Sequence, residues 1–306
     1  MKISRFLTGL LLCCISHFLP AQQIADTTYA PVIAQPAYKK GKGPVVMIDQ
    51  AHYNYHTRTG RYLPFARLLE RDGYVVKDYN GRFRKIDLDQ GKILVISNAL
   101  NSLNAQNWFL PTPSAFSLPE IDAIINWVKA GGSLFLIADH MPMAGAAMDL
   151  AAKFGFQFTN GFVIDTSTDG PSYFQLKDSS LVESVITRGR DVGEHVDHVV
   201  TFTGQGFRIP KTATPVLVFD DRYINYLADT AWVFGPKTPI MKMKGWCQGA
   251  YMPYGSGRIS VFGEAAMFTA QLSGPNRRKV GMNSPEAGQN FQLLLNIMHW
   301  LDSTLP

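Results

Sequence analysis

Two short stretches of this sequence place aspartate and histidine together where an apolar run ends. In the first stretch, Asp49 is followed by His52 and His56. In the second stretch, Asp139 is followed directly by His140. Carboxylate and imidazole groups that lie close together can exchange protons with a substrate or bind a divalent metal ion. The chain has only 7 histidines, so these two points are where we look first for chemistry.

Other polar groups also follow apolar runs, and each has a structural alternative. Asn98 and Asn101 follow a third run, and Glu264 follows a fourth. A glutamate at such a point can belong to the first turn of a helix, and Asp49 can cap a turn through its own backbone. The second aspartate-histidine pair precedes Met141-Pro142, which is typical of a plain turn. The sequence leaves these alternatives open.

The segments that must position these residues alternate between strand and helix over the first half of the chain. Apolar runs rich in β-branched residues predict buried strands at residues 44–49, 74–79, 92–99 and 134–139. Helical spacing of apolar residues predicts helices at residues 62–72, 117–129 and 144–154. Ser117 and Glu120 form a capping-box pattern at the start of the second helix. This alternation predicts an α/β fold with a parallel sheet covered on both faces.

The second half of the sequence changes character. Residues 160–215 are rich in glycine and polar residues, and we expect strands at 199–207, 215–221 and 231–235. Residues 249–264 predict a hairpin that turns at Gly255-Ser256-Gly257. A last helix is expected at 284–301, with Ser284 as N-cap and Pro285 at its first position.

In an open parallel sheet, ligands bind outside the carboxyl ends of the strands, so the residues after the strands should share one site. The candidate catalytic residues are Asp49, His52, Asp139, His140 and Glu264. The candidate ligand-binding residues are His56, Asn98, Asn101, Arg277 and Asn283. Carboxylate and imidazole ligands suit zinc or manganese, so a divalent metal is a candidate cofactor and its identity is unknown. Arg277 belongs to a basic loop, residues 273–283, that could hold an anion or simply be solvated.

The first 21 residues are typical of a secretory signal peptide. Lys2 and Arg5 precede an apolar run at residues 6–19, and Ala21 is a small residue suited to the position before the cut. The run is shorter than the roughly 20 residues that span a membrane. We therefore expect a periplasmic or extracellular protein without a membrane span after cleavage, with an uncleaved anchor as the alternative. Residues 22–43 are interpreted as a tether or an edge segment.

Charge and cysteine usage limit the function further. Two of the basic residues behind the net charge of +5 lie in the expected signal peptide. The remaining charge is too small and too dispersed to indicate nucleic acid as a partner. Two of the 3 cysteines also lie in the signal peptide, so Cys247 would have no intramolecular partner. We expect Cys247 to be a buried, inert thiol, with a nucleophilic role as the alternative.

Four stretches resemble exported bacterial proteins with a class I glutamine amidotransferase-like domain, in the uncharacterised branch that also holds the ThuA-like proteins. They are "VVMIDQAHYNYHTRTGRYLPFARLLERDGYVV", "ILVISNALN", "FSLPEIDAIINWVKAGGSLFLIADHMPMAGAAMDLAAKFGF" and "GRISVFGEAAMFTAQ". The resemblance implies a three-layer, mostly parallel, flavodoxin-like sheet in a single domain, residues 44–306. A mixed β-rich insertion would occupy about residues 160–245.

The resemblance also shows where the chemistry differs. True amidotransferases carry a nucleophilic cysteine on the turn after a central strand, together with a histidine and a glutamate. The matching turn, residues 138–142, has no cysteine, so glutaminase activity is not expected. The sequence also lacks the Gly-x-Ser-x-Gly elbow, the Walker loop, the dinucleotide-binding fingerprint and His-Glu-x-x-His.

Three classes of function remain open. The first is a hydrolase-like enzyme that uses the residues at the strand ends. The second is a binding module for a small molecule, glycan or peptide, with aromatic side chains as stacking surfaces. The aromatic candidates are Tyr53, Tyr55, Trp108, Phe109 and Phe116. The third is a component of an envelope assembly. The oligomeric state is not set by the sequence.

Overall fold

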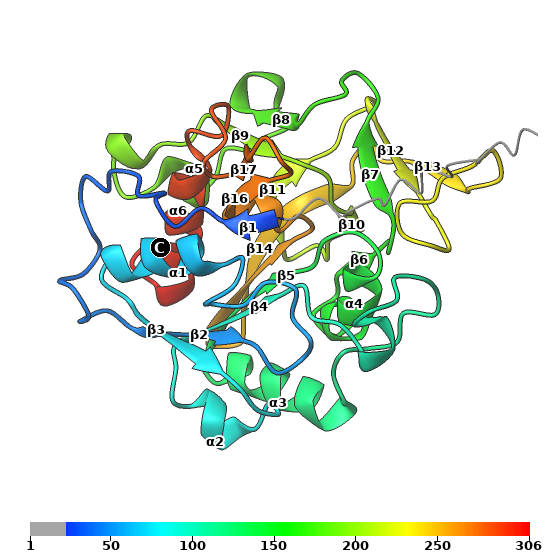
Figure 1. The fold of residues 1–306 in the computed structure, drawn as a ribbon. Coiled ribbons are helices and arrows are strands. Elements are labelled where there is room, and N and C mark those ends of the chain that lie inside the picture. Colours follow the sequence, from blue (N-terminus) through cyan, green and yellow to red (C-terminus); the bar gives the residue numbers. More distant parts are fainter. Residues whose placement is uncertain (1–22) are drawn as a thin grey trace, which may run out of the picture.

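A nine-stranded sheet forms the centre of the protein (Figure 1). The computed structural model describes residues 23–306, and the expected signal peptide lies outside this range. The strand order is β3-β2-β4-β5-β15-β14-β10-β6, and β11 pairs with β14. The parallel strands are β2 (Val45–Asp49), β3 (Val75–Tyr79), β4 (Ile93–Ser97), β5 (Ser133–Ile137) and β15 (Gly257–Phe262).

Antiparallel pairings extend the sheet beyond β15. These strands are β14 (Cys247–Tyr254), β11 (Thr214–Val218), β10 (Phe207–Arg208) and β6 (Gln157–Phe158). The predicted hairpin is confirmed, since β14 and β15 pair through the turn at Gly255 and Ser256. The chain crosses over from β3 past β2 to β4, which is the flavodoxin-like point of reversal in strand order.

Helices cover both faces of this sheet, which confirms the three-layer α/β class. Buried residues of α1 (Leu63–Arg71) and α6 (Asn290–Asp302) pack on one face. Buried residues of α3 (Leu118–Lys129) and α4 (Met143–Lys153) pack on the other. The capping box of Ser117 and Glu120 at the start of α3 is also confirmed. Two single-turn helices, α2 (Lys85–Leu88) and α5 (Val185–Arg188), lie at the periphery.

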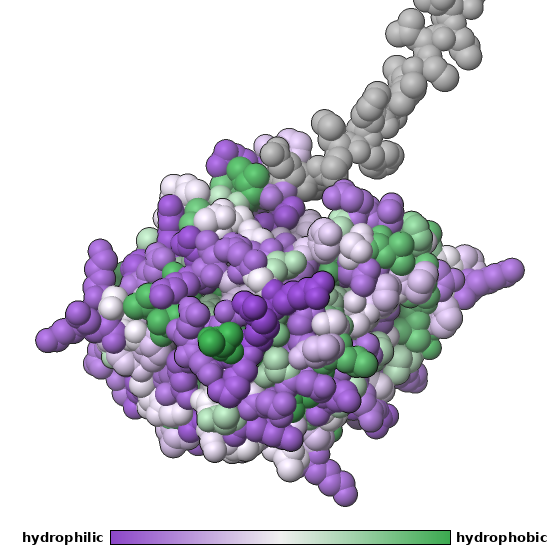
Figure 2. Space-filling model, turned by 90° about the horizontal axis from the view of Figure 1, so that it is seen from below, coloured by the Kyte–Doolittle hydropathy of each residue, from purple (hydrophilic) through white to green (hydrophobic). Residues whose placement is uncertain are grey.

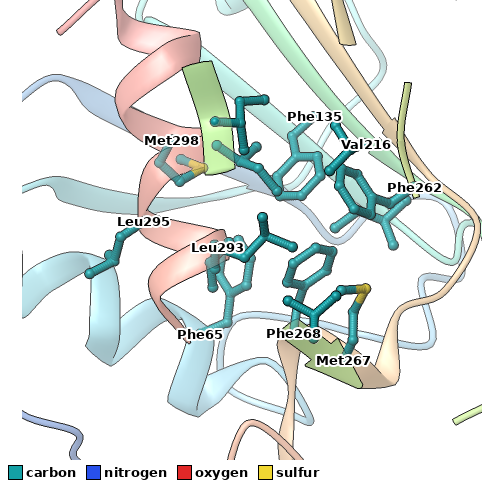
Figure 3. Packing of buried hydrophobic residues seen from close by; sticks show 14 of the residues in the cluster. Phe65, Phe135, Val216, Phe262, Met267, Phe268, Leu293, Leu295 and Met298 are labelled. Carbon is teal, nitrogen blue, oxygen red and sulfur yellow. The ribbon is translucent and has the colours of Figure 1, made fainter. Parts of the chain in front are cut away.

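Aromatic residues form much of the core between the sheet and α6 (Figure 3). The rings of Phe135, Phe262 and Phe268 meet edge to face, with centroids 5.2 to 5.9 Å apart. Leu293 and Met298 of α6 pack against this cluster. Complete burial of each such side chain stabilises the fold by roughly 1.5–3 kcal/mol. Phe262 ends β15, so this core fixes the backbone that leads into Glu264.

Residues between β6 and β14 form two further small sheets as well as the strands added to the central sheet. One consists of β7 (Phe162–Asp165), β12 (Tyr223–Tyr226) and β13 (Ile240–Lys242). The other pairs β8 (Ser172–Gln175) with β9 (His198–Thr201). The single strand expected at 199–207 is wrong, because β9 and β10 belong to different sheets and Gly204 turns the chain between them at φ +103°. No strand forms at 231–235 either, where Trp232 has φ +64°.

The fourth sheet joins the two ends of the described chain. It consists of β1 (Gln23–Ala25), β16 (Ala270–Ser273) and β17 (Arg278–Gly281). The segment interpreted as a tether or an edge segment, residues 22–43, therefore supplies an edge strand. The basic loop expected at 273–283 is wrong in part, because its second half is β17.

The last helix begins later than the sequence pattern suggests. α6 starts at Asn290, after Gln289, and Ser284 is not its N-cap. The Ser284 hydroxyl donates to the Glu286 carboxylate at 2.5 Å instead, within a turn closed by Ala287 N–H and the Ser284 carbonyl at 3.0 Å. Gly288 then interrupts the pattern, since glycine disfavours helix.

The surface around α2 and α3 is mainly hydrophilic, with hydrophobic side chains scattered over it (Figure 2). Scattered hydrophobic residues of this kind are ordinary for a protein surface. Over residues 23–306, no helix combines the length and the apolar character required to cross a bilayer.

Gly204 provides a test of the fold near its carboxyl edge. A Cβ atom there would lie 2.3 Å from the Gly263 carbonyl oxygen, and its φ of +103° disfavours any other residue. We expect Gly204→Ala to lower the free energy of unfolding by roughly 1–3 kcal/mol, the usual range for such backbone strain. Urea denaturation measures this. Gly235→Ala is the control, since a Cβ there meets nothing within 4 Å; equal stability of the two variants would contradict the packing described.

Candidate functional site

A cavity of about 220 Å³ lies at the carboxyl edge of the sheet, where four of the predicted strand ends meet. His56 comes from the loop after β2, and Asn98 directly follows β4. Asp139 and His140 follow β5, and Glu264 follows β15. Five of the ten residues selected from the sequence therefore line one cavity.

Asn98 ties two of these strand ends together. Its backbone has φ +48°, a conformation that asparagine tolerates better than most residues. Its side-chain Oδ1 accepts a hydrogen bond from the Asp139 N–H at 2.8 Å. Its carbonyl accepts the Tyr55 N–H at 2.9 Å, which holds the loop after β2 against β4. Asn98 therefore fixes the Asp139 backbone and the loop after β2 relative to the end of β4.

Glu264 is a buried carboxyl group, only 1% exposed, beside a second carboxylate. Its two oxygens accept the backbone N–H groups of Ala266 and Met267 at 2.9 and 2.7 Å, at the start of the 3₁₀ turn Ala266–Phe268. Burial raises the pKa of Glu264 well above its ordinary value, and the charge of Asp139 adds to this. The backbone donors oppose the shift without cancelling it. Glu264 can therefore retain a proton where a surface glutamate would lose it.

His140 is oriented by a backbone carbonyl. Its Nδ1 lies 2.7 Å from the Met141 carbonyl oxygen, which can only accept, so Nδ1 carries a proton. In the neutral ring, Nε2 is then the unprotonated nitrogen, and it lies 4.0 Å from Asp139 Oδ1. The ring stacks on Phe162 with centroids 4.4 Å apart, and Trp232 approaches it edge-on at 4.7 Å. These contacts hold the imidazole in one orientation beside the carboxylate.

His56 is the second histidine of the cavity and is completely buried. Burial and the nearby Arg61 charge lower the pKa of His56 to about 3, so it is neutral at ordinary pH. Its Nδ1 has no hydrogen-bond partner among the described residues. The ring rests on Tyr62, with centroids 4.7 Å apart.

Asp49 and His52, in contrast, do not reach this cavity. His52 Nδ1 lies 2.9 Å from Asp49 Oδ1, and His52 Nε2 lies 3.1 Å from Glu120 Oε1. The ring stacks on Phe83 and meets the edge of Phe116. Of the five candidate catalytic residues, Asp139, His140 and Glu264 line the cavity. Asp49 and His52 do not, because His52 is directed toward α3, where Glu120 is an additional acceptor.

The Asp49 group behaves as a structural network. The Asp49 carboxylate also accepts the Ala51 N–H at 3.2 Å, which is the turn-capping role left open by the sequence. Burial opposes the charge on His52, but hydrogen bonds and charges of Asp49 and Glu120 outweigh it and raise the pKa of His52. Asn101 belongs to this side as well, lining a separate cavity of about 490 Å³ together with His52 and Glu120.

Arg277 and Asn283 lie outside both cavities. Arg277 is an exposed residue in the turn between β16 and β17. The Asn283 side chain donates to Asp26 Oδ2 and the Gln271 carbonyl, at 3.0 and 3.1 Å. Neither lines the cavity at the carboxyl edge, although Val280 between them does, because Arg277 lies in the exposed turn and the Asn283 side chain is bonded to Asp26 and Gln271.

The structure adds residues that sequence reasoning missed. They are Gln23, Met143, Phe202, Thr203, Trp232, Ala266, Gln271 and Val280, which line the cavity with Tyr55 and Trp108. They come from α4, the small β1-β16-β17 sheet, the insertion and the turn after β15. Apart from Ala266, which follows β15, they do not come directly after strands of the parallel sheet, so the strand-end rule could not find them.

The remaining sequence candidates can be placed in the same way. Tyr55 and Trp108 line the cavity, while Phe116 is buried against His52 and Phe109 is exposed. No group of three or more histidine, cysteine or acidic residues in the described chain is arranged to hold a metal ion. Cys247 is buried in β14, and burial raises the pKa of its thiol to about 12. A thiol that remains protonated is a poor nucleophile, in agreement with the inert role expected for it.

No protein-family model and no curated protein matches this chain. Among solved structures, the "mmIFT52 N-terminal domain" is similar at 13% identity and TM-score 0.57, covering 84% of this chain and 96% of that chain. The cytoplasmic protein STM3548 from Salmonella typhimurium is similar at 14% identity and TM-score 0.50, covering 84% and 98%. A ThuA-like protein from Bacteroides uniformis reaches TM-score 0.48 at 13% identity, covering 90% and 96%. At such low identities the likeness concerns the fold alone.

The His52 network makes stability depend on pH. The pKa of His52 is raised from 6.5 in the fold, so its contribution to stability is complete below about pH 6.5 and is lost as pH rises through the raised pKa. We expect His52→Gln to destabilise the protein more at pH 5.5 than at pH 9, as measured by urea denaturation at both values. The exposed His195 provides the control in His195→Gln. An equal loss for His52→Gln at the two pH values would show that the charged pairings do not form.

Proposed function

We propose that the protein is an exported, hydrolase-like enzyme that works in the cavity at the carboxyl edge of the sheet, and that it is not a glutaminase. The observation that carries this proposal is the carboxyl pair of Asp139 and Glu264 beside the oriented imidazole of His140. Structural carboxylates are usually paired with cations, but the described residues lining this cavity include no lysine or arginine. Groups with perturbed pKa values in a cavity are typical of catalytic sites.

The geometry assigns a role to each group. His140 Nε2 accepts a proton from a water molecule whose oxygen attacks the electrophilic carbon of the substrate. Glu264 donates its proton to the leaving group as the bond to that carbon breaks. Asp139, 4.0 Å from His140 Nε2, stabilises the imidazolium that forms. Return of the proton from His140 to Glu264 through solvent restores the starting state.

Two features argue against the thioester route of the amidotransferases. The turn after β5, residues 138–142, has no cysteine, and none of its residues has the positive φ of a nucleophile elbow. The one cysteine in the described chain, Cys247, does not line the cavity. Export rests on the signal-like residues 1–21.

The alternative is a binding module that performs no chemistry. It is favoured by one observation: aromatic side chains at the cavity include the exposed ring of Trp232. Such rings bind sugars and other apolar faces without any catalytic group. The two proposals differ in what happens to a bound ligand, so turnover separates them.

Removal of the carboxyl groups tests the enzymatic proposal. With a panel of chromogenic esters, amides and glycosides, we expect turnover of at least one class by the wild type. Glu264→Gln should lower kcat by roughly 10²–10⁴-fold, the usual contribution of a general acid. Asp139→Asn should lower kcat as well, because the imidazolium of His140 loses its neighbouring negative charge. The control is Asp197→Asn, which alters an exposed aspartate-histidine pair, with Asp197 Oδ1 2.6 Å from His198 Nδ1. Binding without turnover in the wild type would favour the alternative; full turnover by a folded Asp139→Asn variant would exclude the assigned role.

The raised pKa of Glu264 gives an independent prediction that needs no substrate. Between the ordinary value of 4.5 and the raised pKa, the folded state binds more protons than the unfolded state. The free energy of unfolding should therefore fall as pH rises through this window, and Glu264→Gln should remove that component. Urea denaturation from pH 5 to pH 9 measures the slope, and Glu183→Gln, at a surface glutamate, should leave it unchanged. An unaltered slope in Glu264→Gln would contradict the retained proton.

A further inference from the structure

Two loops that contribute Trp108 and Trp232 to the lining of the cavity pair with each other. The Ala231 N–H donates to the Trp108 carbonyl at 2.8 Å, and the Leu110 N–H donates to the Asp229 carbonyl at 2.9 Å. Phe109 and Thr230 form a bridge between them. We call residues 108–110 and 229–234 the aromatic rim. These two backbone segments hydrogen-bond each other, so the rim presents mainly side chains to a ligand.

The side chains of the aromatic rim are large, apolar and exposed. Trp232 is 52% exposed and lines the cavity, although its ring also contacts His140 and Phe162. Phe109 and Phe234 of the rim are exposed as well. Trp232 has φ +64°, a conformation that is costly for a bulky residue. The fold thus holds an indole between the buried catalytic groups and solvent.

The interior of the cavity, unlike the apolar aromatic rim, carries polar side chains. Its lining includes Asn98, Thr203 and Gln271 as neutral hydrogen-bonding groups. Gln271 is buried, and its Oε1 has no hydrogen-bond partner among the described residues. His56 Nδ1 is likewise buried and unpartnered. Both atoms are closed off from solvent, so it is the neutral polar lining as a whole that favours a ligand with its own hydroxyl groups.

The volume of the cavity and the charge of its lining restrict the class of ligand further. The volume of about 220 Å³ is below the roughly 300–1,000 Å³ of pockets that enclose drug-sized ligands, so it admits one small ring. The aromatic rim extends beyond the cavity and provides a surface for the next unit of a chain. An anionic ligand would meet Asp139 without a lysine or arginine in the described lining to balance its charge. An extended peptide would find few free backbone partners along the paired loops.

We propose that the cavity and the aromatic rim together bind the end of a neutral carbohydrate chain, with the terminal ring inside the cavity and the next ring stacked on Trp232. Hydroxyl groups of the terminal ring hydrogen-bond to the neutral polar lining, which includes Asn98, Thr203 and Gln271. The apolar face of the next ring covers the indole. This inference rests on the proposed hydrolytic function only for the cleavage step, because recognition by the rim does not require turnover. If cleavage occurs, Glu264 protonates the glycosidic oxygen, the bond from that oxygen to the anomeric carbon breaks, and water supplies the new hydroxyl.

Binding and cleavage of defined oligosaccharides test the proposal. The probes are neutral gluco-, manno-, xylo- and N-acetylglucosamine oligomers, with oligogalacturonides as the charged counterpart and tripeptides as the alternative class. Calorimetry and tryptophan fluorescence measure binding, and chromatography measures release of the terminal sugar. We expect at least one neutral series to bind and the charged series not to bind. Trp232→Ala should weaken the affinity roughly tenfold, a loss of about 1.4 kcal/mol for one stacked ring.

The control variant is Tyr53→Ala. Tyr53 matches Trp232 in being an exposed aromatic residue, at 58%, with a positive φ of +47°, but it does not line the cavity. Its replacement should leave affinity unchanged. Trp232→Phe, which retains an aromatic face, should restore most of the binding lost in Trp232→Ala. This separates stacking from a general disturbance of the loop.

The outcomes separate the carbohydrate site from the hydrolytic function. No binding of any neutral series at millimolar concentration overturns the carbohydrate inference, as does preferential binding of tripeptides or of oligogalacturonides. Neutral oligosaccharide binding that Trp232→Ala weakens and Tyr53→Ala does not supports the inference. If a bound oligosaccharide is not cleaved, or if Asp139→Asn still cleaves it at the wild-type rate, the carbohydrate site stands and the hydrolytic function fails.

Discussion

A carboxyl group that is removed from water needs hydrogen-bond donors from the chain around it. Glu264 is such a group, and its need for donors shapes the protein where the parallel strands end. Two backbone N–H groups of the following 3₁₀ turn reach its oxygens. That turn can form only because Gly263 and Gly204 allow two backbones to approach closely. The same turn directs the Ala265 N–H toward Asp139 Oδ2, at 3.4 Å. The segment that holds this acid thus also contacts Asp139, after β5, and Gly204 of the insertion.

The parallel sheet explains why polar groups gather at its carboxyl edge. The insertion explains why these groups line a cavity. Helices seal both faces of the parallel strands, so polar side chains accumulate where those strands end. An open edge of this kind would be a shallow surface by itself. The loop at Thr203, the rim loop at Trp232 and the small sheet that contains Gln271 add walls on several sides. The parallel half of the protein supplies the carboxyl and imidazole groups of the cavity, and the other segments enclose them.

The sequence predicts the parallel half well, because its signals are local. The apolar runs of β2, β4 and β5 and the capping box of α3 each need only a few neighbouring residues. The strand-end rule also selects Asn98, Asp139, His140 and Glu264. It does not determine the direction of His52, because a residue in a loop can face either side, and Glu120, distant in sequence, decides the outcome. Nor does any spacing in the sequence relate Trp232 to His140, since their contact depends on the path of the whole insertion.

The small sheet that pairs β1 with β16 has a consequence for how the protein folds. Gln23 and Gln271 line the same cavity although 248 residues separate them along the chain (271 − 23). Contacts over such long sequence separations require closure of very large loops, which is entropically costly and kinetically slow. The neighbouring strands β2, β3, β4 and β5 can pair before this closure occurs, whereas β15 and α6 join the core from far along the chain. We therefore expect the cavity to be completed late in folding, after these four strands have paired.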